Sequence, residues 1–369
     1  MNTLERAQLL EQTLRTFPQM GMITAGDLLA LVEKELGHRE ALDGFFEYAR
    51  SGGLTIRSRA IPPASIIHIC AGTLANPGIL SLCFGLLLGS RNHVKLPSAG
   101  CPELERFLRE LPASLQAMVE AGPGPFDYSA AGAVIVYGSD ETVAAIRRQV
   151  PARTPFLAHG HRLSYGIVFR EAATATTAHC AAWDASAYDQ QGCLSPHDIY
   201  VQEGGELSPA QFAAAVAKAM QTVHEGGRCP GLSEKRSLGE SAAILQVRSA
   251  YRFRAANDPR VVLWESPGSD AWTVIHEEDP QFATSCLNRV LFIKPFRDPV
   301  EIVAATEWVR PLVSTVGTAP VEKLSPDLQR QLGAARICPL GHMQSPPLLR
   351  HHDARPHLAD LVTWLDREE

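Results

Sequence analysis

The sequence lacks several patterns that mark common classes of protein. Its most apolar stretch, residues 79–89, is too short to span a membrane, which takes about 20 residues. The eight cysteines include no CxxC pair, which argues against a zinc ribbon or a disulfide framework and favours reduced thiols. Basic residues are not in excess, because 34 Lys and Arg stand against 40 Asp and Glu and give a net charge of −6. We therefore expect no nucleic-acid partner and no membrane span.

The overall composition is that of an ordinary globular protein. Of the 369 residues, 45% are hydrophobic and 20% are charged, so the length predicts about two domains. Glu5 and Glu11 interrupt the apolar positions of the first helix pattern, which is untypical of a signal peptide or a transit helix. We therefore expect a cytoplasmic protein.

Strand and helix patterns alternate along the chain, as in a parallel α/β sheet. Strands are predicted at 54–59, 65–70, 93–96, 133–137, 156–158, 163–169, 199–201, 261–264, 272–276 and 289–294. Helices are predicted within the first fifty residues and at 79–88, 102–111, 142–149, 208–223, 299–307 and 357–366. No GxGxxG motif and no internal repeat accompany this pattern.

One cysteine stands apart from the other seven. Cys193 lies in the stretch WDASAYDQQGCLSPHDIY, where Gly192 precedes it and a predicted strand follows a few residues later. A nucleophilic cysteine needs access together with backbone N–H groups or positive charge, and this polar turn provides access. From the residues alone, a buried and inert cysteine remains the alternative. Asp184 and Asp189 would raise the pKa of the thiol if they faced it, so we expect them to point away and hold the loop.

A second candidate site follows the predicted strand AVIVY at 133–137. Gly138 allows a tight turn, and Ser139 is a good N-cap for the next helix, whose N-terminus would lie at the carboxyl end of a parallel strand. Asp140 and Glu141 would oppose a phosphate bound there. An ordinary strand-to-helix turn is the alternative.

Two histidine clusters raise the question of a metal. His159-Gly160-His161 lies in a predicted turn and His351-His352-Asp353 near the end, but neither is accompanied by a partner motif with zinc spacing. We expect no metal, and we expect the second cluster to be a surface loop.

Four stretches together resemble the acyl-CoA reductase family typified by the reductase subunit of bacterial bioluminescence fatty-acid reductase, a branch of the aldehyde dehydrogenase superfamily. They are GTLANPGILSLCFGLLLGSRNHVKLPS at 72–98, VIVYGSDETVAAIRRQVP at 134–151, AHGHRLSYGIV at 158–168 and YDQQGCLSPHDIYV at 188–201. The match extends more weakly to ARICPLGHM at 335–343 and to the final segment.

The resemblance implies an α/β fold of the aldehyde dehydrogenase type, with a Rossmann-like cofactor domain, an α/β catalytic domain and the active site in the cleft between them. We assign 1–184 to the N-terminal helices and cofactor domain, 185–345 to the catalytic domain, and 346–369 to a C-terminal loop and helix.

The same resemblance assigns roles to individual residues. It makes Cys193 the acyl-accepting nucleophile. Lys95 and Ser98 would lie beside the adenine ribose or its 2′-phosphate, and Gly138 and Ser139 would face the cofactor.

Three positions depart from the pattern of the family or its superfamily. Thr73 stands where the family commonly has an asparagine that holds the oxyanion, so Thr73 is a candidate catalytic residue and Asn76 a substitute for it. His352-Asp353-Ala354 replaces the family's tryptophan-aspartate-glycine. Aldehyde oxidisers carry a glutamate where this chain has Ala158 or His159, which makes His159 the third candidate catalytic residue and predicts slow hydrolysis of the acyl-enzyme.

The predicted function is reduction of an acyl thioester to the aldehyde through a thioacyl-enzyme on Cys193. The expected cofactor is NADPH, with NADH as the alternative. The expected partners are acyl-CoA or an acyl-carrier protein, further copies of the chain in a homo-oligomer, and a synthetase or acyltransferase. Two other functions stay open: a CoA-acylating aldehyde dehydrogenase working in the reverse direction, and a hydride-free acyl-transfer subunit.

Overall fold

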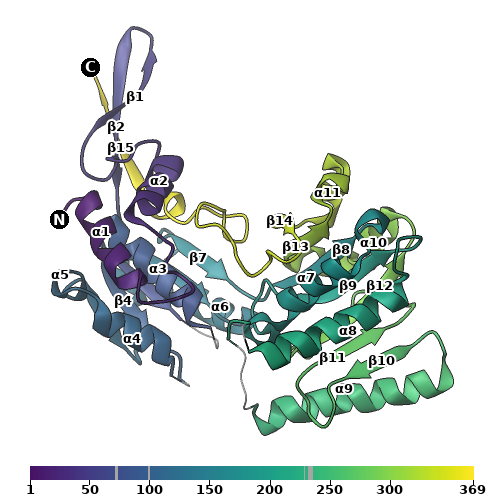
Figure 1. The fold of residues 1–369 in the computed structure, drawn as a ribbon. Coiled ribbons are helices and arrows are strands. Elements are labelled where there is room, and N and C mark those ends of the chain that lie inside the picture. Colours follow the sequence, from purple (N-terminus) through teal and green to yellow (C-terminus); the bar gives the residue numbers. More distant parts are fainter. Residues whose placement is uncertain (71–73, 99, 228, 232–235) are drawn as a thin grey trace. The chain divides into compact units, whose positions relative to one another are not determined.

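The computed structural model in Figure 1 describes residues 1–70, 74–98, 100–227, 229–231 and 236–369. The chain forms two compact units. Residues 1–161 with 347–369 form unit 1, and residues 162–346 form unit 2.

This division differs from the predicted domain boundaries. The predicted boundary at 184/185 falls inside helix α7 (Ala175–Ser186), which belongs to unit 2. The reason is that strand β8 (Leu163–Val168) pairs with later strands, so the chain has already entered the second sheet by residue 162. The last segment, 347–369, belongs to unit 1.

The central sheet of unit 1 has five parallel strands in the order β5-β4-β3-β6-β7. Their bounds are β3 (Ser65–Ile69), β4 (Arg91–Lys95), β5 (Val119–Gly122), β6 (Ala133–Tyr137) and β7 (Phe156–His159). The chain runs from β3 outward to β5 and then returns to β6 on the other side of β3. In open α/β sheets, ligands bind at the carboxyl ends of the strands where the order reverses, here between β3 and β6.

The described residues of unit 1 form six α-helices. They are α1 (Thr3–Leu14), α2 (Ala25–Leu36), α3 (Ala75–Leu88), α4 (Pro102–Glu110), α5 (Ala113–Gln116) and α6 (Asp140–Arg147). The apolar stretch at 79–88 is a buried helix, as predicted, because α3 buries Ile79, Leu82 and Leu86 completely. Among the described residues, no helix is long and apolar enough to cross a membrane.

A small antiparallel sheet in the order β1-β2-β15 completes unit 1. It consists of β1 (Phe46–Ser51), β2 (Leu54–Ile61) and β15 (Thr363–Glu368). The helix predicted at 357–366 is therefore wrong. Residues 363–368 pair with 56–61, and this pairing with a segment near the start of the chain overrides the local helical pattern.

Unit 2 is built on a seven-stranded sheet in the order β10-β11-β12-β9-β8-β13-β14, in which only β10 is antiparallel to its neighbour. The other strands are β9 (Pro196–Gln202), β10 (Val262–Glu265), β11 (Thr273–His276), β12 (Val290–Phe296), β13 (Val313–Ala319) and β14 (Arg336–Pro339). The remaining helices are α8 (Pro209–Gly226), α9 (Leu238–Asn257), α10 (Pro299–Ala305) and α11 (Pro326–Leu332). Every residue of β9 is buried, as in a strand that is covered on both faces.

Candidate active site

Cys193 lies in a tight turn that leads into β9 in unit 2. Its side chain is half-buried, and its carbonyl oxygen accepts a hydrogen bond of 2.6 Å from Oγ of Ser164 at the start of β8. The backbone N–H of Ser195 donates to the carbonyl of Gly192 at 2.9 Å and closes the turn. The thiol therefore sits on a short turn fixed to two central strands.

Two left-handed turns lie beside Cys193. Tyr188, Asp189 and Gln190 have φ values of 54°, 52° and 62°, and Leu287, Asn288 and Arg289 have φ values of 63°, 56° and 64°. We call residues 188–190 and 287–289 the paired left-handed turns. Left-handed backbone costs roughly 1–2 kcal/mol for each residue with a side chain, so such runs persist only where surrounding contacts fix them.

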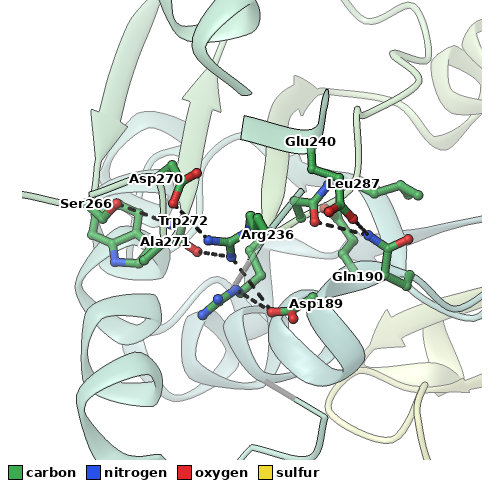
Figure 2. A network of polar contacts seen from close by, with 12 residues as sticks. Asp189, Gln190, Arg236, Glu240, Ser266, Asp270, Ala271, Trp272 and Leu287 are labelled. Carbon is green, nitrogen blue, oxygen red and sulfur yellow. Dashed lines mark hydrogen bonds and ion pairs between the residues drawn. The ribbon is translucent and has the colours of Figure 1, made fainter. Parts of the chain in front are cut away.

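A buried ion pair joins the two turns. Asp189 contacts Nε of Arg289 at 3.0 Å, and the two side chains are 8% and 2% exposed. Arg236 contacts Asp189 at 3.8 Å and is itself bound by Asp270 at 3.0 Å and by the carbonyl of Ala271 at 3.3 Å. Figure 2 shows Arg236 between these two groups of partners. As expected, Asp189 holds the loop, because its carboxylate is committed to arginines.

The two glutamines before the cysteine continue this network. Nε2 of Gln190 donates to the carbonyls of Pro196 and Val290 at 2.7 and 2.9 Å, and Oε1 accepts from the N–H of Val290 at 2.9 Å. Nε2 of Gln191 donates to Oδ1 of Asn288 at 3.1 Å. The residues that precede Cys193 are thus bonded to the start of β9 and to the segment that begins β12.

Asp184 fixes the other side of the turn. Its carboxylate accepts from the N–H groups of Gly341 and Met343 at 2.5 and 3.1 Å, and burial raises its pKa to about 7. Gln344 donates to Oγ of Ser195 at 3.1 Å. The carboxylate of Asp184 therefore holds the end of the stretch ARICPLGHM (335–343), and the next residue, Gln344, contacts the cysteine turn.

Burial makes most of the other seven cysteines weaker acids. Burial raises the pKa of Cys70 and Cys229 to about 12 and that of Cys338 to about 11, and it also raises the pKa of Cys180 and Cys286. A thiol with a raised pKa is a poor source of thiolate at neutral pH.

The predicted cofactor residues lie at the carboxyl edge of the unit 1 sheet. Lys95 is the last residue of β4, and the exposed Ser98 follows it. Gly138 and Ser139 join β6 to α6, and Oγ of Ser139 accepts from the N–H of Thr142 as the predicted N-cap. Gly138 and Ser139 follow β6, at the reversal of strand order between β3 and β6, whereas Lys95 and Ser98 follow β4 on the other side of β3.

One of the two acidic residues at the start of α6, Asp140, has a structural role. Oδ1 of Asp140 accepts from the N–H of His161 at 2.9 Å and so holds the turn after β7. Glycine is required at position 160, because a Cβ there would lie only 2.3 Å from Oδ1 of Asp140.

The predicted catalytic Thr73 lies outside the described residues, and Asn76 is in the first turn of α3.

His159, at the end of β7, is contacted by a carboxylate and by two aromatic rings. Its Nδ1 lies 3.0 Å from Oδ2 of Asp353, and the two side chains are 8% and 3% exposed. Its ring stacks on Tyr137 at 4.5 Å between centroids and on His352 at 4.4 Å. Possible ligand atoms of His159, His352 and Asp353 all lie within 4.8 Å of one another.

The prediction that the HHD stretch forms a surface loop is wrong for two of its three residues. The side chains of His352 and Asp353 are 14% and 3% exposed, because they fold onto β7. Burial lowers the pKa of His352 to about 3, so this imidazole is neutral. Ala354 has a φ of 63°, a conformation that favours glycine, which agrees with the glycine of the family pattern noted above.

Comparison with known proteins decides the family. The sequence model of the family described as Acyl-CoA reductase (LuxC) matches residues 1–118 and 127–364. The chain belongs to this family. A relative from Photobacterium leiognathi, long-chain acyl-protein thioester reductase 2, is 23% identical over 358 residues, which cover 92% of this chain and 70% of the relative.

Solved structures show the same fold. The putative aldehyde dehydrogenase PutA from Anabaena variabilis aligns with a TM-score of 0.69 at 14% identity, over 100% of this chain and 88% of that one. Proline utilization A from Bradyrhizobium japonicum aligns with a TM-score of 0.70 at 13% identity; the alignment covers 100% of this chain but only 43% of that longer one. The fold is therefore of the aldehyde dehydrogenase type, as predicted. Membership in a reductase family with this fold makes the chain an oxidoreductase and implies a nicotinamide cofactor.

Proposed function

We propose that the protein reduces an acyl thioester to the aldehyde with NADPH, through a thioacyl-enzyme on Cys193. The observation that carries the proposal is the half-buried Cys193 in a turn braced by the paired left-handed turns and by Ser164, in a chain of the acyl-CoA reductase family. Acyl-CoA and acyl-carrier protein are the proposed donors. The name of the Photobacterium relative, an acyl-protein thioester reductase, supports the second.

The chemistry of Cys193 balances as an acyl transfer followed by release. The thiolate Sγ attacks the thioester carbonyl carbon, a new C–S bond forms, and the bond to CoA or carrier breaks with its electron pair on the departing thiolate. We propose that the backbone N–H of Cys193, with Thr73 or Asn76, holds the oxyanion. A reduced nicotinamide, when bound, supplies the hydride. Sγ then leaves as a thiolate when the aldehyde is released.

The residues at the carboxyl edge of the unit 1 sheet fit a dinucleotide. Ser98 and Ser139 offer hydroxyl groups, and Lys95 offers a positive charge at the end of β4. Asp140 and Glu141 would oppose a phosphate, so we propose that Gly138 and Ser139 face a part of the cofactor other than its phosphates, while the adenosine ribose lies beside Lys95 and Ser98. The preference for NADPH over NADH rests on Lys95, which we propose to pair with a 2′-phosphate.

Free acid should be a minor product. Ala158 and His159 end β7, where aldehyde oxidisers carry a glutamate, so no carboxylate of that position activates water against the thioacyl-enzyme. We propose that reduction or exchange with a thiol is the productive fate. CoA-acylating oxidation of an aldehyde is the same reaction in reverse.

We further propose that the protein works in the cytoplasm as a homo-oligomer, together with a synthetase or acyltransferase that supplies the acyl group. If it were only an acyl-holding subunit of such a complex, Cys193 would acylate but no nicotinamide would bind.

Intact-protein mass spectrometry tests the acyl transfer without any cofactor. Incubation with a long-chain acyl-CoA should add one acyl group to the wild-type protein, and peptide mapping should locate it on Cys193. Cys193→Ala should gain none, whereas Cys286→Ala, which removes another half-buried thiol, should acylate normally. Acylation that persists in Cys193→Ala would refute the assignment.

A further inference from the structure

Two side chains that flank Cys193 bind one and the same segment of unit 2. Gln190, before the cysteine, exchanges two hydrogen bonds of 2.9 Å with the backbone of Val290. His197, after the cysteine, accepts a hydrogen bond of 3.0 Å at Nδ1 from the backbone N–H of Ser285. We call the segment from Ser285 to Val290 the clamp segment. It holds the cysteine turn on both sides.

Ser285 connects the two flanking side chains. Its Oγ donates to the carbonyl of Val290 at 2.5 Å, accepts from the N–H of Leu287 at 2.9 Å and lies 3.4 Å from Oε1 of Gln190. The side chains of Ser285, His197 and Gln190 are all buried, so water does not compete for these bonds. A buried N–H that loses its acceptor retains the full cost of its desolvation, and the N–H of Ser285 therefore depends on His197.

The hydrogen bond fixes the protonation of His197. A backbone N–H can only donate, so Nδ1 must offer a lone pair, and a neutral imidazole then carries its proton on Nε2. The ring also packs on Phe282, with 5.9 Å between centroids. His197 thus has two separable roles, as a hydrogen-bond acceptor toward Ser285 and as a packing surface toward Phe282.

The clamp segment also contains one of the paired left-handed turns, at 287–289. Left-handed residues with side chains persist only where neighbouring contacts fix them. The bonds at Ser285 and Val290 lie on either side of this turn. Release of Ser285 would let the turn relax, and with it Gln190 and the backbone that leads to the cysteine.

We propose that His197 is a positioning residue: its unprotonated Nδ1 fixes the clamp segment and thereby the thiol and backbone N–H of Cys193. This inference rests on the proposed function, in which both groups of Cys193 act on the thioester carbonyl. His197 acts through Ser285 and takes no part in bond making. Its contribution is to placement, and a displacement of about 1 Å at reacting groups can cost roughly 10²-fold in rate.

Three substitutions separate the two roles of His197. His197→Asn removes the ring but keeps an acceptor, because Oδ1 lies as many bonds from Cβ as Nδ1 does. His197→Leu keeps an apolar side chain against Phe282 but removes the acceptor. His197→Gln keeps an acceptor but moves it one bond further from the backbone. All three leave the residues that would bind acyl-CoA or the cofactor unchanged.

The rate of Cys193 acylation by a long-chain acyl-CoA, followed by intact-protein mass spectrometry, measures positioning. The maximal rate constant should stay within about 3-fold of the wild type in His197→Asn and fall by roughly 10-fold or more in His197→Leu and His197→Gln. The acyl-CoA concentration that gives half the maximal rate should change little. His224→Leu, at an exposed position on α8, is the control and should acylate at the wild-type rate.

Two spectroscopic measurements read the contact without activity. In ¹⁵N-histidine spectra at neutral pH, His197 should be protonated on Nε2 alone, with His197→Asn identifying its signals. Hydrogen exchange of the Ser285 amide should be slow in the wild type and in His197→Asn, and faster in His197→Leu and His197→Gln. A proton on Nδ1, or equally slow exchange in all four proteins, would overturn the proposal.

The kinetic outcomes are equally decisive. Equal rates in His197→Asn and His197→Leu would show that the acceptor does not position Cys193, and a slow His197→Asn beside a normal His197→Leu would assign the effect to ring packing; either result overturns the proposal. If His197→Leu does not fold, His197→Gln and the tautomer decide. Failure of the proposed function is distinguishable, because wild-type Cys193 would then not acylate at all, while the tautomer and the exchange rates would still report the contact.

Discussion

Gln190 is the side chain whose loss should most loosen the Cys193 turn. It is fully buried and makes three short hydrogen bonds, two to the carbonyls of Pro196 and Val290 and one from the N–H of Val290. Gln190→Leu keeps a similar volume but removes all three bonds. At about 1 kcal/mol for each net hydrogen bond, the free energy of unfolding should fall by about 3 kcal/mol.

Gln190→Glu keeps the shape and exchanges the donor for a carboxylate oxygen that faces two carbonyls. Burial and these carbonyls should raise the pKa of the new carboxyl in the folded state. A group whose folded pKa is raised stabilises the protein below its unfolded pKa of about 4.3, and this contribution is lost as the pH rises through the folded pKa. Gln190→Glu should therefore be closer to the wild type at pH 5 than at pH 8.

Urea unfolding at both pH values measures the stability, and intact-protein mass spectrometry measures the rate at which Cys193 is acylated. Both variants should acylate more slowly than the wild type, because the turn at residues 188–190 loses hydrogen bonds to Pro196 and Val290. Gln246→Leu, at an exposed position on α9, is the matched control. A Gln190→Leu variant within about 0.5 kcal/mol of the wild type, the usual range for surface changes, would refute the reasoning.

Three further predictions concern unit 1. Burial lowers the pKa of His68 from 6.5 to about 4, so the contribution of the neutral imidazole to stability is complete above pH 6.5 and is lost as the pH falls toward 4. Urea unfolding should show that the free energy of unfolding falls by about 2 kcal/mol between pH 7 and pH 5. This fall should be absent from His68→Gln. Ala354→Gly should relieve a left-handed residue and raise the midpoint of thermal unfolding, and a lower midpoint would contradict the assigned backbone. Gly160→Ala should displace Asp140 from the N–H of His161 and cost about 1 kcal/mol, whereas a variant as stable as the wild type would show that this contact is unimportant.

The parts of the fold with a strong local pattern were predictable from the sequence. The strand AVIVY occupies 133–137 as predicted, and the apolar run that begins near Ile79 is a buried helix. The capping box at Ser208 and Gln211, with Pro209 at the first helical position, is also confirmed. In each case the residues next to one another in the chain already determine the element.

Elements that depend on distant partners or lack an apolar face were not predictable. Residues 363–368 form a strand because they pair with residues 56–61, which no local pattern reveals. Helix α9 went unpredicted because its apolar face is short, consisting of Ile244, Val247 and Tyr251. Its other large apolar residues, such as Leu238 and Phe253, are 91% and 73% exposed and obscure the pattern.

The candidate site likewise contains residues that the local sequence pattern reveals and residues that only contacts with distant parts of the chain reveal. Cys193 and the turn at Ser139 carry local signals, whereas the pair of His159 and Asp353 joins two histidine stretches 194 positions apart that each looked unremarkable alone. The partners of Asp189 were equally hidden, since Arg289 is 100 residues away in the chain. Three-dimensional contacts, not spacing, identify these groups.

The most direct test of the central claim is nicotinamide oxidation by the purified protein with short-, medium- and long-chain acyl-CoAs, run beside Cys193→Ala. The proposed function predicts oxidation that forms aldehyde with at least one chain length, with NADPH preferred to NADH, and no oxidation in Cys193→Ala. Release of CoA in a single stoichiometric turnover, without oxidation of either nicotinamide, would contradict the reductase assignment and leave an acyl-holding subunit.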